Sequence, residues 1–203
     1  MRKARRPAAT ALALALALQL GAAVPAAAAD ITATAGYENG NSPLNLTQIA
    51  RYASGQFNVD GGVMEIVAYN RANSFAYAIN GQSGLLAAIS LENLAAGSFV
   101  ARLSGMDIDV KALVEAADSS FRYGDMTSVA VSPDSATLAA ALQAEGYNDA
   151  GRVALFTCNA DGTLTLKGLV ETGVQPDMVT FADNNTVLTA DEGEPREGYG
   201  DGI

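Results

Sequence analysis

The sequence contains no histidine and no tryptophan, and its 203 residues include one cysteine, Cys158. Without histidine, neither Ser-His-Asp nor Cys-His catalysis nor a histidine-ligated zinc site can be built within this sequence. A single thiol cannot form an internal disulfide framework. Because Cys158 ends the apolar run 153–157, we expect a buried core thiol rather than a nucleophile.

Basic residues are also scarce: the sequence has 12 Lys and Arg against 22 Asp and Glu, which gives a net charge of −10. Binding to nucleic acid or to anionic lipid needs clustered basic side chains, so neither is expected as a partner. We expect an extracellular ligand or a surface component of unknown identity. The acidic side chains form either a solvated surface or ligands for divalent cations.

The N-terminus has the three zones of a secretory signal peptide. Four basic side chains lie within residues 2–6, an apolar run follows over 8–24, and Pro25 precedes small residues that end before Asp30. This order predicts a cleavable signal peptide over residues 1–29. The alternative is an uncleaved anchor, but a spanning helix needs about 20 apolar residues. We therefore predict an extracellular or cell-surface protein with no membrane span after cleavage.

Short apolar runs bounded by Gly, Asn, Asp and Ser dominate the rest of the chain, which is typical of strands joined by hairpins. We predict strands over 63–69, 74–79, 84–91, 125–131, 137–142, 151–156, 163–166, 177–181 and 186–190. The stretch 106–117 predicts either a short helix or a strand with a wide turn.

These strands recur as a unit. The units open at Met64, Met126 and Met178, spaced 62 and 52 residues apart. Four-stranded repeats of roughly 40–50 residues predict the blades of a β-propeller, with a β-sandwich as the alternative. We expect a 30–45 polar leader and a 46–203 all-β part holding about two and a half blades. Because propellers close with about 4–8 blades, we expect a fragment of a longer protein, or else a chain that self-associates.

Several of these segments resemble the choice-of-anchor I domain family, which includes mesenchyme-specific cell surface glycoproteins. The resemblance begins at Leu46–Tyr52 and Gly62–Tyr69, and it is sharpest at Thr189–Pro195, which reads T-A-D-E-G-E-P. It implies an extracellular β-propeller held at a surface by an anchor placed C-terminally. It also implies calcium-mineral association, as for the animal members, or the phosphatase-like activity ascribed to some bacterial members.

A group of carboxylates is the candidate ligand site. Asp191, Glu192 and Glu194 surround Gly193, and Glu65 and Asp177 lie near the starts of first strands, where they could converge with this loop in a propeller. Converging carboxylates repel one another unless a cation lies between them. We therefore predict a calcium or other divalent-cation site at these five residues, with a solvated acidic loop as the alternative.

Two functions remain open at this point. The first is a non-enzymatic binding or structural module displayed at a surface, assisted by calcium. The second is a metal-dependent phosphoesterase, in which carboxylate-held metals would replace the missing histidines. We favour the first, because no nucleophile with an adjacent base is visible in the sequence.

Overall fold

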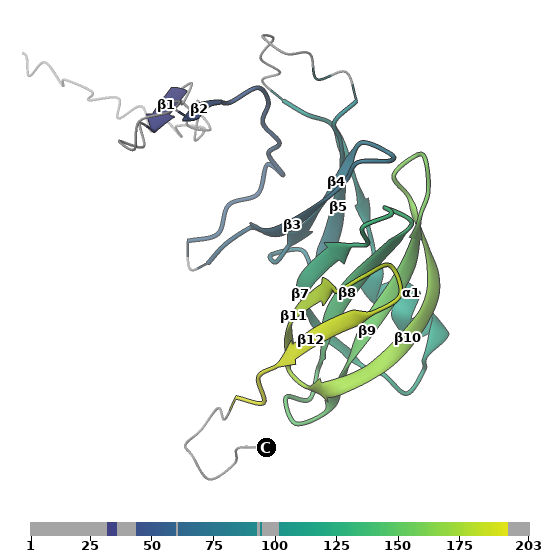
Figure 1. Ribbon diagram of the computed structural model, residues 1–203. Helices are drawn as coiled ribbons and strands as arrows, with labels where there is room; N and C mark the ends of the chain where they lie inside the picture. The colour runs from purple at the N-terminus through teal and green to yellow at the C-terminus, as the bar shows by residue number, and fades with distance from the viewer. Residues whose placement is uncertain (1–31, 36–43, 60, 93, 95–101, 195–203) are drawn as a thin grey trace, which may run out of the picture. The chain divides into compact units, whose positions relative to one another are not determined.

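The computed structural model describes residues 32–35, 44–59, 61–92, 94 and 102–194 (Figure 1). The predicted signal peptide lies outside these residues, as do the segments after Glu194. The chain divides into two units, residues 1–47 and 48–203. Among the described residues, no helix combines the length and the apolar character needed to cross a membrane.

The described residues of the first unit form a pair of short strands, the second of which runs past the end of the predicted 30–45 leader. β1 (Thr32–Ala35) pairs antiparallel with β2 (Leu44–Thr47), and Thr32 lies opposite Thr47. The sequence did not predict these strands, because both are only four residues long and neither has a clear apolar pattern.

The described residues of the second unit form three antiparallel sheets. Sheet 1 has the order β3 (Met64–Asn70), β4 (Phe75–Asn80), β5 (Leu85–Ser90) and β6 (Gly105–Ile108). Sheet 2 has the order β7 (Tyr123–Val131), β8 (Thr137–Ala144), β9 (Ala150–Cys158) and β10 (Leu164–Val174). Sheet 3 holds β11 (Pro176–Phe181) and β12 (Val187–Asp191). The all-β prediction is confirmed and each sheet runs in chain order. Every predicted strand overlaps an observed one, although β10 continues to Val174, well beyond the predicted 163–166.

The sheets stack face to face in the order of the sequence. We call the face of a sheet that points toward the next sheet in sequence its forward face, and the opposite one its backward face. The forward face of sheet 1, carrying Tyr77 and Ile79, packs against Leu138 and Leu142 on the backward face of sheet 2. The forward face of sheet 2 then packs through Ala139, Ala141 and Val153 against Val179 of sheet 3. The first strands of successive sheets lie side by side, β3 against β7 and β7 against β11.

This stacking explains the residue types in the strands. β8 is buried on both faces, so its central residues Leu138–Leu142 form one continuous apolar run instead of alternating. In sheet 3 only the backward face is covered by described residues. Val179 is therefore buried, while Met178 and Leu188 on the forward face are about half exposed.

The ambiguous stretch 106–117 contains both a strand and a helix. Residues up to Ile108 form β6, and helix α1 (Val110–Ala117) follows immediately. Asp109 caps this helix, because its carboxylate accepts the main-chain N–H of Ala112 at 2.8 Å. Val110 and Val114 are fully buried and join the core between sheets 1 and 2.

The expectation that Cys158 is a buried core thiol is confirmed in part. Its side chain is half-buried and packs against the core between sheets 1 and 2, and burial raises the pKa of its thiol.

Candidate functional site

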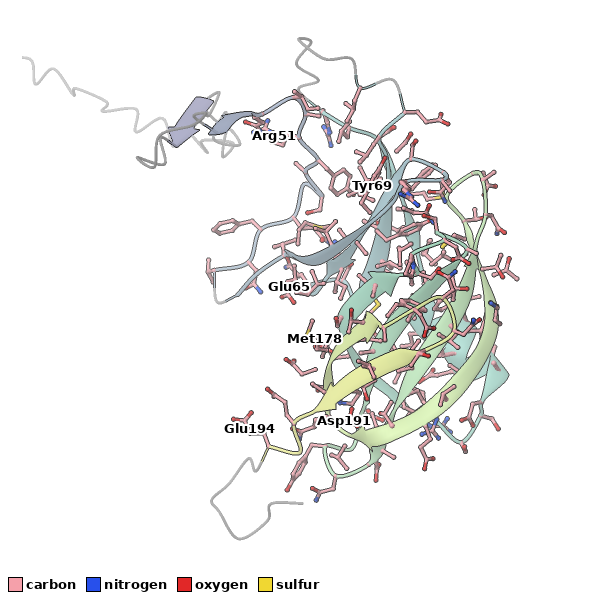
Figure 2. All side chains as sticks on the ribbon, in the orientation of Figure 1. Arg51, Glu65, Tyr69, Met178, Asp191 and Glu194 are labelled. Atoms are coloured by element: carbon pink, nitrogen blue, oxygen red, sulfur yellow. The ribbon has the colours of Figure 1, made fainter. Side chains whose placement is uncertain are left out.

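The five predicted ligand residues are all exposed, and they lie on three strands or just beyond them. Glu65 lies in β3, where its carboxylate approaches the backbone of Gly62 and Gly81. Asp177 lies near the start of β11, Asp191 ends β12, and Glu192 and Glu194 follow it. Figure 2 shows Glu65 on sheet 1, Asp191 at the end of β12 and Glu194 on the segment that follows it.

The described residues bring Asp191, Glu192 and Glu194 into one loop, and the pairing of Pro176 with Asp191 places Asp177 at the same end of sheet 3, whereas Glu65 lies on sheet 1. Within the part of the chain that is described, no three His, Cys, Asp or Glu side chains are placed to share a metal ion. The cation site and the phosphoesterase alternative both stay predictions. We name residues 191–194 the acidic loop.

Hydrogen bonds to the junction between sheets 2 and 3 hold the acidic loop. Asp191 accepts the main-chain N–H of Gly173 at 2.8 Å. The main-chain N–H of Glu192 donates to the carbonyl of Gln175 at 3.0 Å, and that of Gly193 donates to Val174 at 3.2 Å. Gly193 has a φ of 55°, a left-handed conformation that costs glycine little. The loop is thus held through the Asp191 carboxylate and through its own backbone, which leaves the Glu192 and Glu194 side chains exposed to solvent.

Gln175 is the residue at this site that the sequence analysis missed. Its side chain is buried, accepts the main-chain N–H of Glu194 at 2.9 Å, and donates to the Glu194 carbonyl at 3.3 Å. It also donates to the carbonyl of Tyr147 at 3.1 Å, which connects the acidic loop to the turn between β8 and β9. The sequence feature that could have identified Gln175 is its position, since it is a polar residue directly before Pro176 at the junction of two sheets.

Other acidic side chains accept hydrogen bonds that stabilise the turns between strands. Hydrogen bonds lower the pKa of three turn aspartates below the usual range. The leading donors are the Ser132 hydroxyl to Asp134 at 2.6 Å, the Thr163 hydroxyl to Asp161 at 2.6 Å, and the Asn185 N–H to Asp183 at 2.7 Å. Such hydrogen bonds from a turn's own hydroxyl and N–H groups to an aspartate are ordinary turn chemistry and stabilise the turn rather than a ligand site.

A hollow of about 350 Å³ beside sheet 2 holds the clearest ion pairs. Arg152, which is largely buried, lies 3.4 Å from Asp118 and 3.2 Å from Glu171. Its guanidinium also stacks 5.1 Å from the centre of the Phe121 ring. Because this arginine already contacts two carboxylates and two main-chain carbonyls, it ties the end of α1 to sheet 2 and offers little to an anionic ligand.

Comparison with known proteins gives a family and several similar solved structures. None of the curated proteins compared with the sequence matches it. A solved structure assigned as a 6-phosphogluconolactonase from Bacteroides uniformis ATCC 8492 is 21% identical with a TM-score of 0.49. The match covers 74% of this chain and only 38% of that one. The choice-of-anchor I domain matches residues 65–202, which is more than half of the chain and includes all three sheets and the acidic loop. The chain therefore belongs to the choice-of-anchor I domain family.

Proposed function

We propose that this chain forms part of an exported β-propeller domain that is displayed at the cell surface and serves a binding or structural role there. Membership in the choice-of-anchor I family implies a surface-associated, exported protein. The N-terminal zones at residues 1–29 supply a route of export.

The observation that carries this proposal is the repeated contact between first strands. β3, β7 and β11 each open a sheet, and each lies against the next. Propeller blades are four-stranded antiparallel sheets arranged around a common axis with their first strands innermost. The face-to-face packing of sheets 1, 2 and 3 through matched apolar faces supports the same arrangement.

The acidic loop is the place on this domain where we expect ligand contact. It lies at one end of the sheets, anchored by Gln175 to the turn that contains Tyr147. Calcium takes about 6–8 oxygen ligands, including main-chain carbonyls and water, in flexible loops. We propose that a calcium ion binds here through the Glu192 and Glu194 carboxylates, with further ligands from carbonyls, water or the bound partner.

Surface display is tested with intact cells that produce the full chain. We expect an added external protease to remove the protein from these cells. A variant lacking residues 1–29 provides the control and should stay protected until the cells are lysed. Protection of the full chain to the same degree as this variant would exclude display.

Calcium binding is tested separately by thermal melting with added Ca²⁺ and with EDTA. A ligand that binds only the native state stabilises it, by about 2.7 kcal/mol at a concentration of about 100 Kd. The double variant Glu192→Gln, Glu194→Gln should lose the calcium-dependent rise in Tm. A matched double variant at exposed positions, Glu92→Gln, Glu145→Gln, should keep it. An unchanged Tm of the unmodified chain would reject the calcium site while leaving the display result intact.

A further inference from the structure

The turn between β4 and β5 contains an asparagine followed directly by a glycine, because β4 ends at Asn80 and Gly81 comes next. In such a pair the glycine nitrogen can attack the carbonyl carbon of the asparagine side chain, since glycine has no side chain to hinder the approach. The new N–C bond closes a succinimide ring, and the side-chain NH₂ leaves as ammonia with the proton of the glycine N–H. Water then opens the ring to aspartate or isoaspartate, so this pair can lose its amide without an enzyme.

Hydrogen bonds in the fold occupy the groups that this reaction needs. The Asn80 side chain is 4% exposed, and its Nδ2 donates to Oε1 of Gln56 at 2.7 Å. Its Oδ1 accepts the main-chain N–H of Ser83 at 3.2 Å. The N–H of Gly81 donates to the carbonyl of Val63 at 3.0 Å. Because the Gly81 nitrogen must lose its proton and the Asn80 side chain must turn toward it, these bonds have to open before the ring can close.

Two of these bonds reach the segment that precedes β3, since Gln56 and Val63 both belong to it. Phe57 and Val59 of the same segment are 79% and 78% exposed, so their side chains add little packing against sheet 1. Movement of this segment away from the turn frees the Asn80 amide and the Gly81 N–H together. Such a local opening costs less free energy than unfolding of the whole chain.

Both products fit the closed turn poorly. Aspartate at position 80 has no N–H to donate to Gln56, and it adds a second negative charge near Glu65, whose carboxylate lies beside Gly81. Isoaspartate routes the main chain through the former side-chain carbon and so lengthens the backbone by one atom. This extra atom falls where position 80 pairs with Met64 and Leu85. Either product therefore opposes the return of the segment to the turn.

We propose that Asn80 and Gly81 form a deamidation site controlled by the segment that precedes β3, and that deamidation detaches this segment from the β4–β5 turn irreversibly. The hydrogen bonds to Gln56 and Val63 keep the pair unreactive in the closed fold. Each opening exposes the pair to reaction, so the deamidated fraction of a population increases with the time its molecules have spent open.

The test incubates the full chain in mildly alkaline buffer and measures deamidation at Asn80 by mass spectrometry of proteolytic fragments, with isoaspartate detection. The same chain unfolded in urea gives the reference rate, and we expect the folded chain to react about tenfold more slowly or less. Gln56→Ala should speed the reaction of the folded chain about fivefold, because one of the hydrogen bonds that close the turn is lost. Phe57→Ala is the matched control and should leave the rate unchanged, since this neighbouring side chain is exposed.

The effect of the product is measured on the variant Asn80→Asp, which reproduces one product directly. We expect faster amide hydrogen exchange at Gly81 in this variant, because its N–H loses the carbonyl of Val63. Asn148→Asp, at an exposed turn position, is the matched control and should leave this exchange unchanged. Deamidation of the folded chain as fast as in urea, equal rates in Gln56→Ala and Phe57→Ala, or unchanged exchange at Gly81 in Asn80→Asp would each overturn the proposal.

Discussion

Asn73 of sheet 1 donates its side-chain amide to the main-chain carbonyl of Asn159, between β9 and β10 of sheet 2, across 2.8 Å. Similar contacts link the other turns at this end of the stack. Asn70 donates to the carbonyl of Ser135 at 2.8 Å, and Asp134 donates its main-chain N–H to the Asn184 side chain at 3.0 Å. Each sheet is therefore joined to the next by an asparagine side chain as well as by apolar packing.

Replacing Asn70 should destabilise the chain strongly. Asn70 is fully buried, and its carbonyl oxygen also accepts the N–H of Ala72 at 2.9 Å. Asn70→Ala leaves these groups without their partner, and a buried unsatisfied polar group costs about 1–3 kcal/mol. Urea denaturation measures the change. Asn148→Ala, at an exposed turn position, is the control and should change stability by less than about 0.5 kcal/mol.

Gly162 should not tolerate a side chain. Its φ is 84°, and an added Cβ would lie well inside the van der Waals contact distance of the Phe75 ring carbons. Gly162→Ala therefore combines backbone strain with overpacking and should cost about 2 kcal/mol or more. Gly168→Ala is the matched control, because nothing lies within 4 Å of the added Cβ. Thermal melting of both variants checks the difference, and an equal fall in Tm would contradict the predicted contact.

The buried tyrosines should make the fold sensitive to alkali. Burial raises the pKa of Tyr77 to about 12 and also raises the pKa of Tyr123. The folded state holds these protons more tightly than the unfolded state. The resulting stability is present in full below about pH 10 and is lost as the pH rises toward about 12. We expect Tyr77 alone to account for a loss on the order of 2 kcal/mol.

Denaturation of Tyr77→Phe between about pH 9 and about pH 12 measures this contribution. The variant loses the hydrogen bond in which Asn73 donates to the Tyr77 hydroxyl at 3.0 Å, so it should be less stable at pH values below this range. Its stability should nevertheless fall less steeply with pH. Tyr69→Phe, at a position that is 55% exposed, should retain the slope of the unmodified chain.

Substitutions of Gln175 should loosen the acidic loop. Gln175→Ala removes the hydrogen bonds to Glu194 and Tyr147 and should cost about 1–3 kcal/mol. It should also speed amide hydrogen exchange at Glu194. Gln175→Gly loses the same bonds but relieves a φ of 54°, so it should be more stable than the alanine variant by about 1 kcal/mol.

Gln82→Ala, at an exposed turn position, should leave both the stability and the exchange at Glu194 unchanged. If Gln175→Ala exchanges at Glu194 as slowly as the unmodified chain, backbone contacts alone hold the acidic loop.

The sequence predicted most of the second unit because its strands are short, apolar and separated by turns with recognisable chemistry. The runs that begin near Met64, Met126 and Met178 all form first strands, and the family assignment from the T-A-D-E-G-E-P segment is confirmed. The boundary inside 106–117 was not predictable, because Ile108 and Val110 fit a strand and a helix equally well.

The site was predicted less completely than the fold. Carboxylates can be recognised by residue type, but their separation depends on strand register, which local sequence does not specify. Glu65 is displaced by an irregularity between Met64 and Val67, and Asp177 by one between Pro176 and Met178. Gln175 was missed because its role depends on a left-handed backbone and on a partner 19 residues away.

The alanines of β8 have a geometric consequence for the whole stack. Ala139, Ala140 and Ala141 are fully buried near the first strands, whereas Phe156 and Leu164 occupy the strands farther out in the same sheet. Three consecutive alanines leave little side-chain volume at the middle of β8, so the elements packed on both faces of sheet 2 lie against its backbone there. A bulky residue at Ala140, which belongs to the core shared by sheets 1 and 2, would therefore push these two sheets apart.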